Sequence, residues 1–74
     1  MPVRGAPYVG APVVVVFLAQ RVRGVVEKVE DGGRRLLVVT EDGESIRFSL
    51  SPATGAFVEE GRKVGGARLM FEDS

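Results

Sequence analysis

The chain has 74 residues, enough for one small domain, and its ten basic and ten acidic side chains cancel at neutral pH. It contains no cysteine and no histidine, which excludes disulfides, a zinc site built on these ligands and a nucleophile activated by histidine. A chain of this size buries only about 60% of its unfolded surface, so association with other chains is its available source of extra stability.

Three of the four prolines and two glycines fall within residues 1–12, which excludes a helix there and disfavours pairing in a sheet. We therefore predict an extended arm over residues 1–12 and a single β-barrel domain over residues 13–74. Residues 11–19 lack polar side chains but are far shorter than the roughly 20 residues of a membrane-spanning helix. Phe17 and Ala19 also make a poor signal cleavage site, so a cytoplasmic protein without a membrane partner is expected.

Residues 13–18 are a continuous run of β-branched and aromatic side chains, which favours a strand over a helix. Residues 35–40 form a second run of this kind. Runs without polar alternation predict strands that are covered on both faces, and a domain this small cannot cover them internally. The outward residues are the candidate oligomer surface: Val14, Val16, Leu37 and Val39.

The predicted strand over residues 21–30 changes its apolar phase. Its valines fall into two alternating sets, Val22 with Val26 and Val25 with Val29. Gly24 lies at the change, and a glycine there predicts a β-bulge or a sharp bend, which small barrels use to curl their sheet.

Turns and short strands continue to the C-terminus. Turns are predicted at residues 31–34 and at Asp42-Gly43, and residues 44–50 alternate as a strand with one wet face. Shorter strands are expected at residues 57–58 and 68–72. The pattern predicts an all-β fold, a strongly bent antiparallel sheet or barrel of five or six strands.

No catalytic constellation is present in the sequence. Each pair of adjacent carboxylates, at residues 41–42, 59–60 and 72–73, lies in or beside a predicted turn or terminus where both acids stay ionised. Residues 61–66 do not end in the lysine followed by a hydroxyl residue that a phosphate-binding loop requires. We therefore expect no enzymatic activity, no metal, no cofactor and no small-molecule substrate.

The sequence does offer candidate binding residues, both basic and aromatic. Four arginines flank the second predicted strand at its ends and are candidate contacts to nucleic acid or another anion: Arg21, Arg23, Arg34 and Arg35. Two aromatic residues near loops, Tyr8 and Phe57, are candidates for stacking on a base or on a partner protein. Phe17 and Phe48 fall at core phase instead.

Residues 15–39 resemble the Sm-like family. The features that carry the resemblance are the strand end Phe17-Leu18, the bent strand Val22-Arg23-Gly24-Val25-Val26, the acid Glu30 and the aliphatic run Leu36 to Val39. It implies a small barrel that assembles into rings, with the base-binding loop position at Arg34 or a neighbour. The proline-rich arm replaces the family's N-terminal helix, and the family's last-strand signature is absent. SH3-like and OB-like barrels share the outline, so the topology stays open.

Two functions follow from these observations. The leading prediction is a non-enzymatic barrel that self-associates and acts as a structural or protein-interaction module, with itself or another protein as partner. The alternative is an Sm-like protein that binds single-stranded RNA, and this alternative predicts binding that weakens steeply as salt rises.

Overall fold

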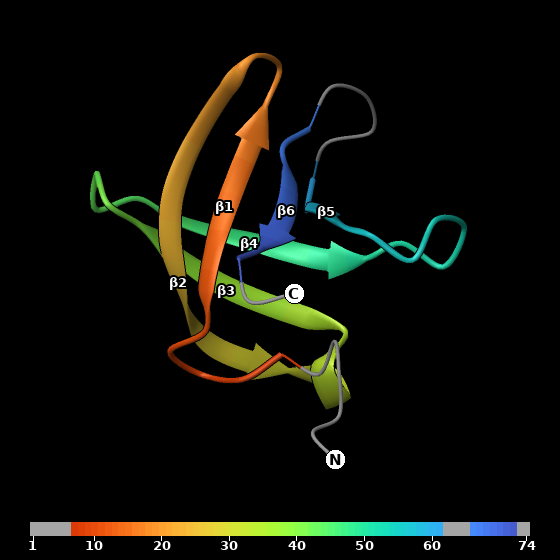
Figure 1. Cartoon of the computed structure of the whole chain (residues 1–74). Helices are drawn as coiled ribbons and strands as arrows, with labels where there is room; N and C mark the ends of the chain where they lie inside the picture. The colour runs from red at the N-terminus through yellow and green to blue at the C-terminus, as the bar shows by residue number, and fades with distance from the viewer. Residues whose placement is uncertain (1–6, 62–65, 73–74) are drawn as a thin grey trace.

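A computed structural model describes residues 7–61 and 66–72, which form a closed antiparallel barrel of six strands (Figure 1). The strands are β1 (Pro12–Phe17), β2 (Gln20–Glu30), β3 (Arg35–Thr40), β4 (Ser45–Leu50), β5 (Phe57–Glu59) and β6 (Arg68–Phe71). β1 and β2 curl together in a long hairpin beside β6, and β3 and β4 cross behind them. The structure confirms the all-β prediction.

Each strand pairs with the next one along the chain, and β1 also pairs with β6, which closes the barrel. The β5–β6 seam is the shortest pairing, with the register pair Val58 and Arg68 and a 2.9 Å hydrogen bond from the Glu59 N–H to the Ala67 carbonyl. The valine-rich strand β1 therefore has a neighbour on both edges. Copies of the chain cannot add to it by edge pairing, so only its outward face is open to a partner.

The core is built by strict alternation, even where the sequence is apolar at every position. Val13 and Val15 of β1 are buried, and so are Leu36 and Val38 of β3, while their apolar sequence neighbours face outward and are half-buried. Phe48 of β4 lies fully buried at the centre. Because successive side chains of a strand point to opposite faces, the two apolar runs place half of their valines and leucines on the outside of the barrel.

The bulge of β2 lies after Gly24 and not at it, which corrects the first of the two predictions made for Gly24, a β-bulge or a sharp bend. The β2–β3 register is regular from Gly24 to Val26 and shifts before Lys28, so Glu27 is the extra residue. This bulge causes the observed phase change, because it brings both Val26 and Val29 to the inner face. Gly24 lies where the backbones of β2 and β3 come close together, and a side chain does not fit there, since a Cβ would lie 2.7 Å from the Val39 carbonyl oxygen.

The predicted turns are present. Residues 31–33 form a short 3₁₀ turn, and Gly43, with a φ of +87°, closes the β3–β4 hairpin by donating its N–H to the Thr40 carbonyl at 2.9 Å. Pro12, assigned to the arm from sequence, is the first residue of β1, and residues 1–6 of that arm lie outside the described part of the chain. Within the described ranges, no helix has the length and apolar character needed to cross a membrane.

Candidate functional site

The outward side chains of β6, β1, β2 and β3 follow one another around the outside of the barrel, because directly paired residues of antiparallel strands project from the same side of the sheet. Val14 of β1 lies between Met70 of β6 and Arg23 of β2. Val25 of β2 lies between Pro12 and Val39 in the next row. We call this surface the outer face and define its apolar part as Val14, Val16, Val25, Leu37, Val39 and Met70.

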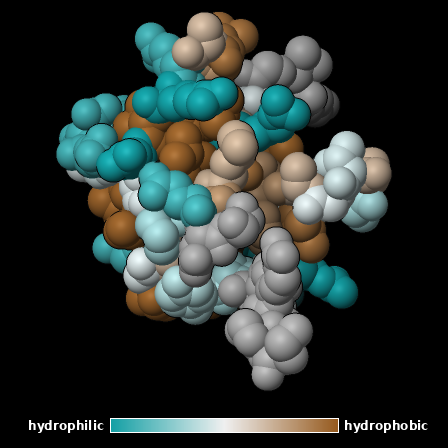
Figure 2. Space-filling view, viewed as in Figure 1, coloured by the Kyte–Doolittle hydropathy of each residue, from teal (hydrophilic) through white to brown (hydrophobic). Residues whose placement is uncertain are grey.

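The outer face contains all four residues that sequence reasoning assigned to an oligomer surface, and each of the four is half-buried. The two most exposed apolar residues of this face are ones the sequence did not single out, Val25 with 46% and Met70 with 54% of its surface exposed. Figure 2 shows apolar surface over β1 with hydrophilic side chains lying across it. Val25 and Met70 join this surface only through the strand register, which no local sequence signal reveals.

A basic row crosses one end of the outer face. Val16 pairs with Arg21 on one side and with Arg68 on the other, so the two guanidinium groups flank a valine. Arg23 lies in the adjacent row and contacts Glu72, with 3.4 Å between its Nε and the carboxylate. The structure thus brings the predicted residues Arg21 and Arg23 together with Arg68, which sequence reasoning missed because it lies far along the chain.

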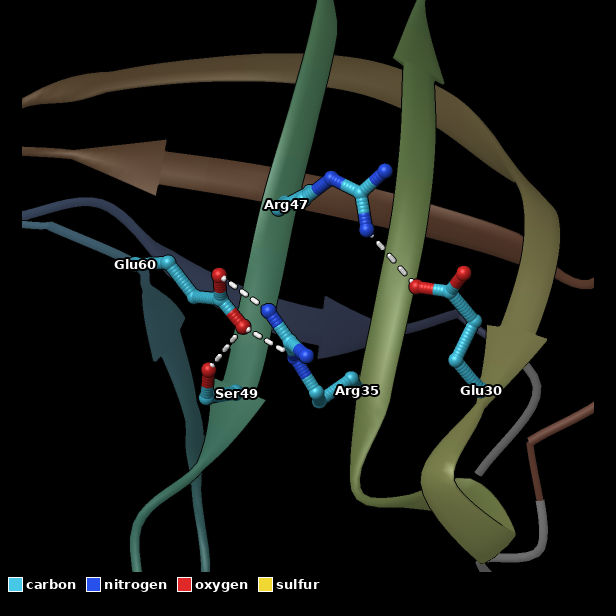
Figure 3. A network of polar contacts seen from close by, with 5 residues as sticks. All are labelled: Glu30, Arg35, Arg47, Ser49 and Glu60. Carbon is cyan, nitrogen blue, oxygen red and sulfur yellow. Dashed lines mark hydrogen bonds and ion pairs between the residues drawn. The ribbon is translucent and has the colours of Figure 1, made fainter.

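The other two predicted arginines lie at the opposite end of β2. Arg35 is engaged by Glu60, to which it donates from Nε at 2.7 Å and from Nη2 at 3.0 Å (Figure 3). The Ser49 hydroxyl donates to the same carboxylate. These donors, Arg35 first, lower the pKa of Glu60 to about 2. Arg34 is exposed at the end of the 3₁₀ turn, so the four arginines form two separate groups and not one track.

The second polar contact at this end joins Arg47 of β4 to Glu30 of β2, at 2.7 Å between Nη1 and a carboxylate oxygen (Figure 3). It spans β3, which lies between the two strands in the barrel. Together with the Arg35–Glu60 pair, it neutralises two of the basic side chains beside Leu37. Lys28 pairs with Leu37 in the β2–β3 register and is exposed, so basic side chains lie at both ends of the outer face.

The two candidate aromatic residues have different surroundings. Phe57 is only 8% exposed and packs edge-to-face on Phe71, with 6.0 Å between ring centroids. It is a core residue, which corrects the expectation of a surface aromatic; its strand β5 turns it inward opposite Leu50. Tyr8 is exposed in the turn before β1.

The barrel mouth, where the inner faces of β1, β2 and β4 diverge, holds a groove with a volume of about 480 Å³. Phe17, Val22 and Ile46 supply apolar lining and are only half-buried. Glu44 and Glu59 supply carboxylates, and no basic residue is among the described residues that line the groove. Five strands, β1 to β5, and the turn before β4 contribute to the lining, so sequence reasoning gave no indication of it.

Comparison with protein-family models, with curated proteins and with solved structures finds no match to this chain. The closed barrel confirms the small-barrel part of the Sm-like resemblance. Within residues 7–61 and 66–72, no three acidic side chains gather closely enough to hold a metal ion. What the described arrangement offers chemically is contact surface: an apolar outer face with a basic row, and an acidic apolar groove at the mouth.

Proposed function

We propose that the protein is a non-enzymatic interaction module whose copies associate through the outer face. The observation that carries the proposal is the exposed pair Val25 and Met70, grouped with the half-buried Val14 on one side of a closed barrel. An apolar centre with a charged rim is the composition of a protein interface. Arg21, Arg23 and Arg68 supply this rim, and charges at a rim set partner orientation more than affinity.

The closed barrel favours contact between faces. β1 has both of its edges occupied by β2 and β6, so a second copy has no free backbone there to pair with. Stacking the outer faces of two copies covers the same apolar residues on both, which is the arrangement of a two-fold dimer. The small core of a 74-residue chain gains stability from this burial.

Native mass spectrometry at micromolar concentration tests the proposal. The wild-type chain is expected to be a homo-oligomer, and Val25→Glu and Met70→Glu are expected to shift it to monomer, because each places a carboxylate in the apolar centre. Arg34→Glu is the matched control, since Arg34 is exposed away from the outer face. A strictly monomeric wild-type chain contradicts the proposal.

Single-stranded RNA binding is the second candidate, and the basic row favours it. Arg21 and Arg68 flank Val16, with Arg23 in the next row, so three guanidinium groups share one face. The Sm-like outline of residues 15–39 adds support. Fluorescence anisotropy with single-stranded RNA at about 50 mM salt tests it, and absence of binding there disposes of it. If it holds, Arg21→Ala and Arg68→Ala weaken binding and reduce its dependence on salt, whereas Lys28→Ala, which removes an exposed charge further along β2, does not.

A further inference from the structure

Leu18 is the most exposed large apolar residue of the described chain, with 83% of its surface in solvent. Phe17 pairs with Gln20, so Leu18 and Ala19 are the two residues that turn the β1–β2 hairpin. Of these two, Leu18 alone has a positive φ, +55°. A positive φ at the first central residue of a two-residue hairpin turn is where glycine is the usual residue.

A leucine in this position is unfavourable for a single chain in two respects. Its apolar side chain lies in water, and its backbone occupies the left-handed region that a residue with a Cβ adopts at a cost. A glycine would make the same turn without either penalty. Because 83% of its surface lies in solvent, the leucine side chain is available for a contact outside the monomer.

The groove at the barrel mouth offers the complementary surface. The inner face of the same hairpin supplies Phe17 and Val22 to its lining, and β4 supplies Ile46. The carboxylates of Glu44 and Glu59 complete it. A site with apolar walls and negative charge accommodates an apolar side chain that arrives together with a basic one.

We propose that Leu18 of one copy occupies the barrel-mouth groove of a second copy, in a reciprocal contact. The inference rests on the proposed self-association and names a contact within it. Arg21 is the first charged residue after Leu18, and the tip from Phe17 to Arg21 carries no acid, so its charge complements Glu44 and Glu59. Because the tip adjoins the mouth on each copy, one two-fold axis places both tips in both grooves.

Cysteine cross-linking tests the contact directly, because the natural chain has no cysteine. Leu18→Cys and Glu44→Cys are prepared as separate chains, mixed, and treated with a short bifunctional maleimide. Linked heterodimers are expected. Val9→Cys mixed with Glu44→Cys is the matched control, since Val9 is also an exposed apolar turn residue but precedes β1. Equal linking of the control, or no linking at Leu18→Cys, overturns the inference.

The Leu18→Gly variant distinguishes the Leu18 contact from association through the outer face. The variant keeps the turn, and its monomer is expected to be at least as stable in urea as the wild-type monomer, while its dimer dissociation constant rises about tenfold or more through loss of the anchor. If Leu18→Gly assembles like wild type while Val25→Glu dissociates, self-association stands and the Leu18 contact is overturned. A wild-type chain that is monomeric overturns both.

Discussion

Glu60 accepts two hydrogen bonds from Arg35 and thereby ties the residue after β5 to the first residue of β3 (Figure 3). Ser49 of β4 donates its hydroxyl to the same carboxylate, so three strands meet at one side chain. β5 is only three residues long and its seam with β6 is the shortest in the barrel. The Glu60 cluster therefore secures the strand that has the fewest backbone partners.

The stability of the fold is expected to depend on the charge of Glu60. Its folded pKa of about 2 lies below the ordinary 4.5, so ionised Glu60 contributes stability that is present above pH 4.5 and lost as the pH falls towards 2. Glu60→Gln is expected to be less stable than wild type at about pH 7, with the difference shrinking at about pH 2. Urea unfolding at both pH values measures this, and an equal difference at both contradicts it.

Arg35 is expected to lower the pKa of Glu60 more than Ser49 does. Arg35 brings both hydrogen bonds and positive charge, whereas Ser49 brings one neutral donor, so Arg35 is the largest cause of the low pKa. Arg35→Ala is expected to raise the pKa of Glu60 more than Ser49→Ala does. Carboxyl NMR titration of the two variants measures the order, with Arg34→Ala as the control that leaves the pKa unchanged. A larger effect from Ser49→Ala would show that Arg35 is not the dominant cause of the low pKa.

Gly24→Ala is expected to destabilise the barrel by about 1–3 kcal/mol, because the added methyl group meets backbone that cannot move aside. The nearest atom, the Val39 carbonyl oxygen at 2.7 Å, belongs to the β2–β3 ladder. Lys28→Ala, at an exposed position of the same strand, is the control and is expected to change stability by less than about 0.5 kcal/mol. Equal urea midpoints for the two variants would contradict the prediction, because they would mean that the backbones of β2 and β3 move apart at Gly24 at little cost.

Phe57→Ala is expected to cost about 3–5 kcal/mol, as truncation of a core aromatic does. The residue is nearly buried and packs on Phe71, so a cavity is left behind. Tyr8→Ala removes an aromatic that is 52% exposed and is expected to cost less than about 1 kcal/mol. Thermal and urea unfolding compare the two, and a cost for Tyr8→Ala as large as that for Phe57→Ala contradicts the assignment.

The positions of strands and turns could be predicted from short windows of sequence. The run from Val13 to Leu18 and the turn at Asp42-Gly43 appear in the structure close to their predicted bounds. β-Branched side chains and turn glycines act on the backbone beside them, so local chemistry is sufficient. The predicted position of the bulge was wrong because the apolar pattern shows only that the phase differs between the two halves of β2. The extra residue, Glu27, is identified only by the register with the partner strand β3.

The sequence by itself determined that this is an all-β chain without histidine or cysteine chemistry, with more apolar strand residues than one face of each strand can hold. Only the tertiary structure decided that Arg68 lies beside Val16, that Phe57 is buried, and that a groove opens at the barrel mouth. The physical reason is closure of the barrel: pairing of β1 with β6 joins residues from the two ends of the chain, and no local preference encodes which side chains then become neighbours.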